Sequence, residues 1–152
     1  MSGMPVGSDA AGVLSVEGST LNHIGIVVAD IASSREMYGN LLGLAPISEV
    51  FEDPLQDVKV QFLGFPHKTS VELIEPLSEK SPARLALEKG GGLNHLCLEV
   101  DDLDDSLRRA LASGAICTRR PVPAVAFGGR RIAFVFHRKA GLIEFVERPP
   151  AP

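Results

Sequence analysis

Two segments of this chain repeat one another at a fixed distance. Residues 21–30 read Leu-Asn-His-Ile-Gly-Ile-Val-Val-Ala-Asp, and residues 93–102 read Leu-Asn-His-Leu-Cys-Leu-Glu-Val-Asp-Asp, an offset of 72 residues. The same offset pairs three later positions: Phe62 with Phe134, Glu72 with Glu144, and Glu75 with Glu147. Such a repeat is typical of a duplicated structural unit. We therefore expect two similar halves, each opening with a histidine strand and closing with a glutamate strand.

Strand periodicity suggests a role for the repeated polar residues. Alternate side chains of a strand share a face, so the apolar neighbours of His23 and His95 point away from the rings. Glu72 and Glu144 also lie between apolar residues, where an unpaired carboxylate is costly to bury. A repeat copies structural residues as faithfully as ligands, but histidine and glutamate are residue types that bind metals. We predict one divalent metal shared by these four side chains.

Composition limits the other possibilities. With 152 residues, of which 45% are hydrophobic, the chain is long enough for one domain with its own core. A net charge of −4 argues against a nucleic-acid surface or a polybasic membrane patch. Two cysteines, Cys97 and Cys117, are too few for a disulfide scaffold and favour a reduced, cytoplasmic protein. Residues 1–19 have neither a basic region nor an apolar core and are predicted to form a flexible leader.

The pattern of the first half predicts the order β-α-β-β-β. After the histidine strand, Asp30 is a plausible N-cap for a helix over residues 31–42, which Gly43 ends. Three strands are expected next, at residues 46–51, 58–63 and 69–75. The pair Ser81-Pro82 then predicts the start of a linking helix over about residues 81–90.

The second half repeats this order. Asp102 is predicted to cap a helix that ends at Gly114, and strands are expected near residues 115–119, 131–136 and 142–147. Residues 121–129 contain two prolines and two glycines and are predicted to form a loop that is able to close over a substrate.

Taken together, these stretches resemble the vicinal-oxygen-chelate superfamily, and within it the methylmalonyl-CoA epimerase family. The similarity covers residues 21–147, and it is carried by the two histidine strands, by Val-Glu-Leu-Ile-Glu-Pro at 71–76, by Gly-Gly-Gly-Leu-Asn-His at 90–95, and by Leu-Ile-Glu-Phe-Val-Glu at 142–147. It implies an α+β fold in which two tandem βαβββ modules form a cupped, eight-stranded mixed sheet around a metal site. The modules are expected at residues 20–76 and 92–147 of a single domain over residues 20–147.

The resemblance places the metal ligands on His23, Glu72, His95 and Glu144. Two imidazoles and two carboxylates suit Co, Zn, Ni or Mn and leave positions open for two substrate oxygens. The resemblance further implies an acyl-CoA substrate and a homodimer. Epimerisation would pass through an enolate, with Glu144 as the first candidate for the base and Glu72 as the base for the opposite face.

Four further residues are candidates for binding the substrate: Arg130, Arg131, His137 and Lys139. His137 and Lys139 occupy the place of a His-Pro-Lys turn in the family, but Arg138 replaces the proline. Some epimerases have a glutamate, proposed as a base, where this chain has Val60, and the adjacent Gln61 is unable to replace it. These departures affect the substrate and the second base more than the metal.

Two alternatives to the epimerase remain open. A glyoxalase I-type lactoylglutathione lyase needs the same ligands and the same stabilisation of an enediolate. A small-ligand binding protein without turnover is the alternative from another class, although a simple binding pocket does not need four metal ligands.

Overall fold

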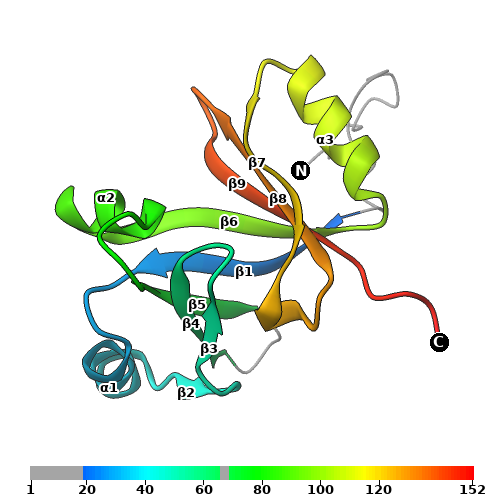
Figure 1. The fold of residues 1–152 in the computed structure, drawn as a ribbon. Helices are drawn as coiled ribbons and strands as arrows, with labels where there is room; N and C mark the ends of the chain where they lie inside the picture. The colour runs from blue at the N-terminus through cyan, green and yellow to red at the C-terminus, as the bar shows by residue number, and fades with distance from the viewer. Residues whose placement is uncertain (1–18, 66–68) are drawn as a thin grey trace, which may run out of the picture.

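A computed structural model describes residues 19–65 and 69–152. The predicted leader, residues 1–19, lies outside the described residues except for Ser19, which already belongs to the first strand. Most of the described chain forms two β-rich halves joined by a short helix (Figure 1).

The first half contains one helix and five strands. In chain order they are β1 (Ser19–Val27), α1 (Ile31–Leu42), β2 (Ala45–Pro46), β3 (Phe51–Asp53), β4 (Val58–Gly64) and β5 (Ser70–Pro76). The helix has the predicted bounds because the Asp30 side chain accepts a hydrogen bond from Ser33 N at 2.7 Å, and because Gly43 adopts φ 70°, a left-handed conformation suited to glycine.

The linking helix α2 (Pro82–Glu88) is capped by Ser81, whose hydroxyl accepts a hydrogen bond from Ala83 N at 3.2 Å. The second half then follows as β6 (Gly92–Val100), α3 (Leu103–Ala112), β7 (Ile116–Pro123), the 3-10 helix η1 (Val125–Phe127), β8 (Arg131–His137) and β9 (Gly141–Glu147). Asp102 caps α3 as Asp30 caps α1, by accepting from Asp105 N at 2.8 Å.

All strands belong to one mixed sheet, in the order β2-β4-β5-β1-β6-β9-β8-β7, with β3 paired to β4. The histidine strands β1 and β6 run antiparallel to each other at its centre, and each is parallel to the glutamate strand of its own half. In Figure 1 β1 and β6 cross the middle of the molecule, with the rest of each half on either side. The cupped α+β architecture is therefore confirmed.

Two details of the sequence prediction were wrong. In the described part of the chain the sheet has nine strands rather than eight, because the strand expected over residues 46–51 is interrupted and forms the short strands β2 and β3. Residues 121–129, which were expected to form a loop, are largely regular secondary structure, since β7 continues to Pro123 and η1 covers Val125–Phe127. The prolines at positions 121 and 123 are tolerated because β7 is an edge strand.

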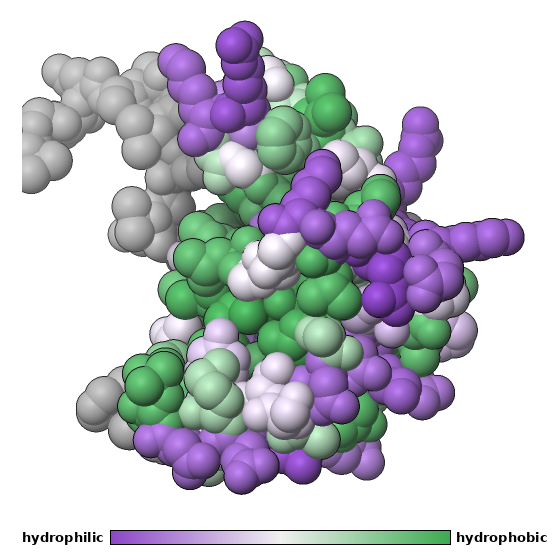
Figure 2. Space-filling view, turned by 90° about the vertical axis from the view of Figure 1, so that its left-hand side faces the viewer, coloured by the Kyte–Doolittle hydropathy of each residue, from purple (hydrophilic) through white to green (hydrophobic). Residues whose placement is uncertain are grey.

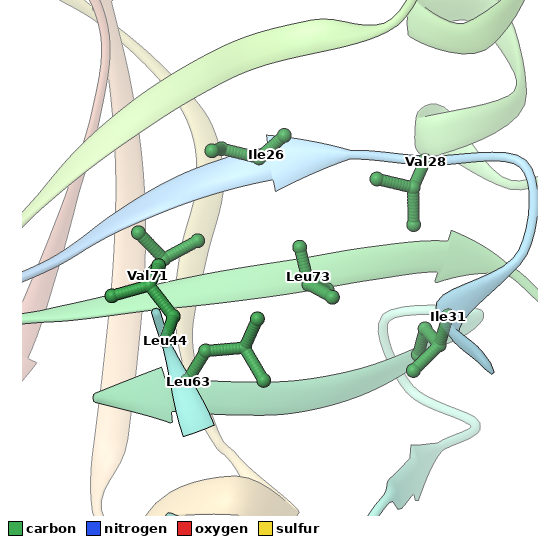
Figure 3. Packing of buried hydrophobic residues seen from close by; sticks show 7 residues of the cluster. All are labelled: Ile26, Val28, Ile31, Leu44, Leu63, Val71 and Leu73. Carbon is green, nitrogen blue, oxygen red and sulfur yellow. The ribbon is translucent and has the colours of Figure 1, made fainter. Parts of the chain in front are cut away.

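Helices α1 and α3 cover the outer faces of the two halves, whereas Ala83 of α2 packs with Val58 and Val60, on the face that the cavity occupies. Outer-face residues of β1, β4 and β5 pack with Ile31 of α1, as Figure 3 shows. The equivalent cluster in the second half joins Leu103 of α3 to Val135 and Phe145. Among the described residues no helix is long and apolar enough to cross a membrane.

Candidate metal centre

The four predicted ligands come together at the centre of the sheet. The register aligns Gly25 of β1 with both Glu72 of β5 and His95 of β6, while Cys97 pairs with both His23 and Glu144. The two histidines and two glutamates therefore meet on the inner face. All four side chains are buried, with exposed fractions of 0% for His23, 7% for Glu72, 6% for His95 and 3% for Glu144.

The ligand atoms converge on one point. His23 Nε2 lies 2.9 Å from Glu72 Oε2 and 3.2 Å from Glu144 Oε2. His95 Nε2 lies 2.9 Å from Glu144 Oε2 and 3.5 Å from Glu72 Oε2. One donor atom from each residue falls within 4.8 Å of all the others. This arrangement is close enough for all four residues to bind one ion.

Two asparagines, which the sequence analysis did not single out, orient the rings. The Nδ1 atom of His23 lies 2.8 Å from Asn22 Oδ1, and that of His95 lies 2.8 Å from Asn94 Oδ1. Because an amide oxygen only accepts, each Nδ1 carries a proton, and each ring, when neutral, turns its Nε2 lone pair to the centre. The signal was present in the sequence, since both histidines follow Leu-Asn.

This orientation fits a bound cation. The two Nε2 atoms face each other at 3.1 Å. If both rings are neutral, two lone pairs oppose each other, and if both are protonated, two N–H groups do. A divalent ion between them would satisfy both nitrogens and neutralise two buried carboxylates, so His23, Glu72, His95 and Glu144 fit such an ion well.

Without an ion the two histidines hold their protons tightly. Burial lowers the pKa of His95, but hydrogen bonds and charge from Glu144 and Glu72 outweigh it and raise the pKa to about 9. The pKa of His23 is also raised, since burial is opposed chiefly by the charge of Glu72. Burial raises the pKa of Glu72, yet the charge and hydrogen bonds of the histidines bring it down to about 2. Metal binding therefore competes with protons.

Aromatic rings and one glycine complete the immediate surroundings. Phe62 meets the His23 ring edge-on at 5.3 Å, and Phe134 meets the His95 ring in the same way at 5.2 Å. A Cβ atom at Gly25 would lie 2.2 Å from the His95 ring, so the ring packs directly on this glycine. Position 25 therefore has to stay without a side chain.

A cavity of about 550 Å³ opens onto the cluster. Glu72, His95 and Glu144 line it, and so does Asn94. Besides Glu72, the first half lines the cavity with one polar residue, Gln56, and with four apolar residues, Val27, Val58, Val60 and Ile74. On the other side are residues of β7 to β9, namely Thr118, Arg119, Arg120, Val122, Phe134 and Leu142. The cavity is thus large enough to hold a small molecule next to the four cluster residues.

The residues predicted to bind substrate lie outside this cavity. Arg130 donates to the backbone oxygen of Glu147 at 2.7 Å and to Glu99 at 3.3 Å. Arg131 pairs with Asp104 and with Glu147. His137 and Lys139 belong to the turn between β8 and β9, where Lys139 N donates to His137 Nδ1 at 3.1 Å. Their contact with a substrate stays a prediction.

The position of the missing family glutamate is apolar. Val60 is 4% exposed and lines the cavity. Gln61 points to the outer side, where it accepts from Arg35 at 3.1 Å and donates to Ser48 O at 3.0 Å. The glutamates of the cluster are therefore the only carboxylates lining the cavity among the described residues.

Comparison with known proteins agrees with this geometry. Residues 22–134 match the model of the glyoxalase/bleomycin resistance protein/dioxygenase superfamily. An ethylmalonyl-CoA/methylmalonyl-CoA epimerase from Cereibacter sphaeroides is 34% identical over 117 residues, which cover 76% of this chain and 86% of the relative. A mitochondrial methylmalonyl-CoA epimerase from Dictyostelium discoideum is 31% identical, over 84% of this chain and 78% of the relative.

Solved structures give the same result. The methylmalonyl-CoA epimerase from Mycobacterium tuberculosis superimposes with a TM-score of 0.74 at 30% identity, covering 93% of this chain and 97% of that chain. The similarity therefore extends over both halves and the cluster between them.

Proposed function

This chain belongs to the glyoxalase/bleomycin resistance protein/dioxygenase superfamily, and from that premise we propose that it is a metal-dependent epimerase that interconverts the C2 epimers of methylmalonyl-CoA. The observation that carries the proposal is the buried cluster of two histidines and two glutamates at the base of a cavity. The similarity to several methylmalonyl-CoA epimerases supports the choice of substrate.

The four residues of the cluster are the proposed metal ligands. His23 and His95 would hold the ion, which we propose to be Co, Zn, Ni or Mn, together with Glu72 and Glu144. A bound divalent ion supplies Lewis acidity, which stabilises negative charge on substrate oxygens. The thioester carbonyl and the free carboxylate of the substrate are the two oxygen groups that flank its acidic C2–H bond.

Glu144 and Glu72 are the proposed bases. Each makes its closest histidine contacts through Oε2, and both side chains line the cavity, which leaves Oε1 for the substrate. Glu144 accepts the C2 proton from one side, and the electron pair of the C–H bond becomes the enolate. A proton that Glu72 has taken up from solvent is then delivered to the opposite side and inverts the centre, after which Glu144 returns its proton to solvent. The lowered pKa of Glu144 keeps this carboxylate ionised near neutral pH, the form that accepts the C2 proton.

A lactoylglutathione lyase of the glyoxalase I type is the second candidate. It is favoured by Val60, since the chain lacks the glutamate that some epimerases have there and relies on the carboxylates of the cluster alone. Both reactions remove a proton next to a carbonyl group, so the same four residues would serve either substrate.

The deciding experiment offers metal-loaded protein one enantiomer of methylmalonyl-CoA in heavy water. We expect deuterium at C2 and racemisation, both lost when the protein is stripped of metal. A parallel assay with the glutathione hemithioacetal tests the lyase. Turnover of the hemithioacetal alone would replace the epimerase by the lyase, and tight metal binding with neither reaction would favour a non-catalytic binding protein.

A homodimer is part of the same proposal. Figure 2 shows apolar side chains gathered on the side of the molecule where α1 and α2 lie, between charged rims. Leu41, Leu85 and Leu93 are 71%, 62% and 82% exposed, and apolar surface gathered on one side of a molecule favours association. Light scattering of the purified protein measures its mass directly, and a monomer at all concentrations would reject the dimer. A cytoplasmic location stays a prediction from the sequence.

A further inference from the structure

Arg119 and Arg120 are the two arginines that line the cavity. The other charged or titratable side chains on its wall are Glu72, His95 and Glu144, which belong to the cluster. Arg119 is half-buried and Arg120 is exposed. Positive charge from these two side chains therefore faces the space above the ligands.

Within residues 19–65 and 69–152, neither arginine forms an ion pair. The ion pairs formed by residues 19–65 and 69–152 use other arginines, for example Arg130 with Glu99 and Arg131 with Glu147. A half-buried guanidinium without a carboxylate leaves up to five donors for a ligand. This distinguishes Arg119 from the arginines first predicted to bind substrate.

The sheet register brings Arg119 into the row of the cluster. Arg119 of β7 pairs with Phe134 of β8, which pairs with Glu144 of β9. Directly paired residues of antiparallel strands share a face, and neighbouring strands are about 4.8 Å apart. The backbone of Arg119 is thus roughly 10 Å from that of Glu144, a distance that an extended arginine and a small acyl group can bridge together.

Two irregularities in β7 explain why consecutive residues both reach the cavity. The pairing of β7 with β8 shifts between Cys117 and Arg119 and again between Arg119 and Val122. In a regular strand, residues 119 and 120 would point to opposite faces. Such β-bulges bend the strand and redirect side chains, and they are frequent next to active sites.

We infer that Arg119 binds the free carboxylate of a malonyl-type thioester in this cavity, with Arg120 adding positive charge at the exposed side. The inference rests on the proposed function, because it names the group that selects the substrate of that same site. Glu72 and Glu144 line the cavity as well, so an acidic acyl group needs a compensating cation to enter. Arginine meets a carboxylate through two parallel hydrogen bonds.

Binding measurements without turnover test this assignment. The metal-loaded protein is titrated with malonyl-pantetheine, which has the carboxylate but no phosphate, with propionyl-CoA, which has phosphates but no acyl carboxylate, and with propionyl-pantetheine, which has neither. Arg119→Ala should weaken malonyl-pantetheine about ten- to a hundredfold, as expected for a hydrogen bond to a charged group. Propionyl-CoA should change by less than about twofold, since its anionic groups are not the proposed partner.

Two further variants separate binding from folding. Arg119→Lys keeps the charge but not the paired hydrogen bonds, so it should recover part of the affinity. Arg108→Ala is the matched control, because Arg108 is exposed on α3 and pairs with Asp105 outside the cavity. It should bind all three ligands as the unchanged protein does.

The outcomes distinguish this inference from the epimerase proposal. Arg119-dependent binding of malonyl-pantetheine by a protein that never exchanges the C2 proton would reject the epimerase and keep the inference. Full epimerase activity with unchanged binding of malonyl-pantetheine in Arg119→Ala would keep the epimerase and reject the inference about Arg119. A loss confined to propionyl-CoA would assign the arginine to phosphate and overturn the carboxylate assignment, as would wild-type protein that binds malonyl-pantetheine no better than propionyl-pantetheine.

Discussion

The two halves of the molecule are alike where they supply the cluster and different where they form the walls of the cavity. Each half supplies an asparagine, a histidine and a glutamate at the same positions, and a phenylalanine edge-on to its histidine. The offset of 72 residues holds for all of them. A shared ion would explain this constancy, because its ligands must reach one point from both sides.

The walls have diverged. Position 119 in the second half is Arg119, whereas the position 72 residues earlier is Ile47, and the first half presents an apolar wall through Val58 and Val60. Gly25 corresponds to Cys97 at the same offset, and the His95 ring packs directly on the glycine. A symmetric cluster with asymmetric walls suits a substrate whose two ends differ, such as a thioester with one free carboxylate.

The glutamates give the largest expected effect and test whether the halves are equivalent in catalysis. Glu144→Gln keeps an oxygen for the ion but accepts no proton near neutral pH, so turnover should fall about 10²- to 10⁴-fold while part of the metal is retained. Glu72→Gln should slow exchange mainly from the opposite enantiomer. Deuterium exchange measured separately from each enantiomer checks both.

The exposed Glu88 of α2 offers the matched control, Glu88→Gln, which should exchange at the normal rate. If both cluster variants kept the wild-type rate with metal bound, neither glutamate would be a base, and the proton would have to pass through another group.

The histidines test equivalence in metal binding. His23→Ala and His95→Ala each remove one ligand, one from each half, and should lower metal affinity by more than about a hundredfold, beyond the cost of losing an outer hydrogen-bond partner. Metal titration with a competing chelator measures the two constants. His137→Ala, outside the cluster, should bind metal normally. Full metal content in either cluster variant would place the ion elsewhere.

The pKa shifts predict how the metal-free protein responds to pH. The folded pKa of His95 is about 9, above its ordinary value of 6.5, so its stabilising contribution is complete below about pH 6.5 and is lost as the pH rises toward 9. A shift of this size corresponds to at most about 3 kcal/mol. The folded pKa of Glu72 is about 2, below its ordinary value of 4.5. Its stabilising contribution is therefore complete above about pH 4.5 and is lost as the pH falls toward 2.

The metal-free protein should therefore be most stable between about pH 4.5 and 6.5, and the affinity for metal should rise with pH above that range. Chemical denaturation at a series of pH values, with and without metal, measures both trends. A stability that stays flat up to pH 9 would contradict the coupling of the histidines to the glutamates.

The sequence was sufficient to predict the cupped α+β architecture and the meeting of the four cluster residues, because both depend on local periodicity and on the repeat. The strand parity of His23 and Glu72 already set their common face, and Asp30 and Asp102 marked both helix starts. The interruption that separates β2 from β3 was not predictable, since apolar residues such as Ile47 and Val50 continue through it.

The cavity wall lies beyond what periodicity can predict. Arg119 and Arg120 are adjacent in the chain, so a regular strand would present only one of them to the site, and both line it because of irregular pairing with β8. Arg130 and Arg131 look equally available in the sequence, yet the fold pairs them with Glu99 and Glu147. Long-range partners of this kind decide which cations stay free for a ligand.

The asparagines give the smallest expected effect and make the sharpest distinction between the halves. Asn22→Leu and Asn94→Leu each remove the acceptor that fixes a histidine tautomer, so metal affinity should fall about 10- to 100-fold in both. Asn94→Asp should restore most of it, because a carboxylate also accepts from Nδ1. Asn22→Asp should restore less, since Asn22 Nδ2 donates to Glu99 at 3.3 Å and a carboxylate there would face that acid. Chelator competition measures all four constants, and imidazole NMR signals report the tautomer independently of activity.

Equal recovery by both aspartates would contradict this difference between the halves. It would mean that Arg130, which contacts Glu99 at 3.3 Å, offsets the added charge, and that the two asparagines are equivalent.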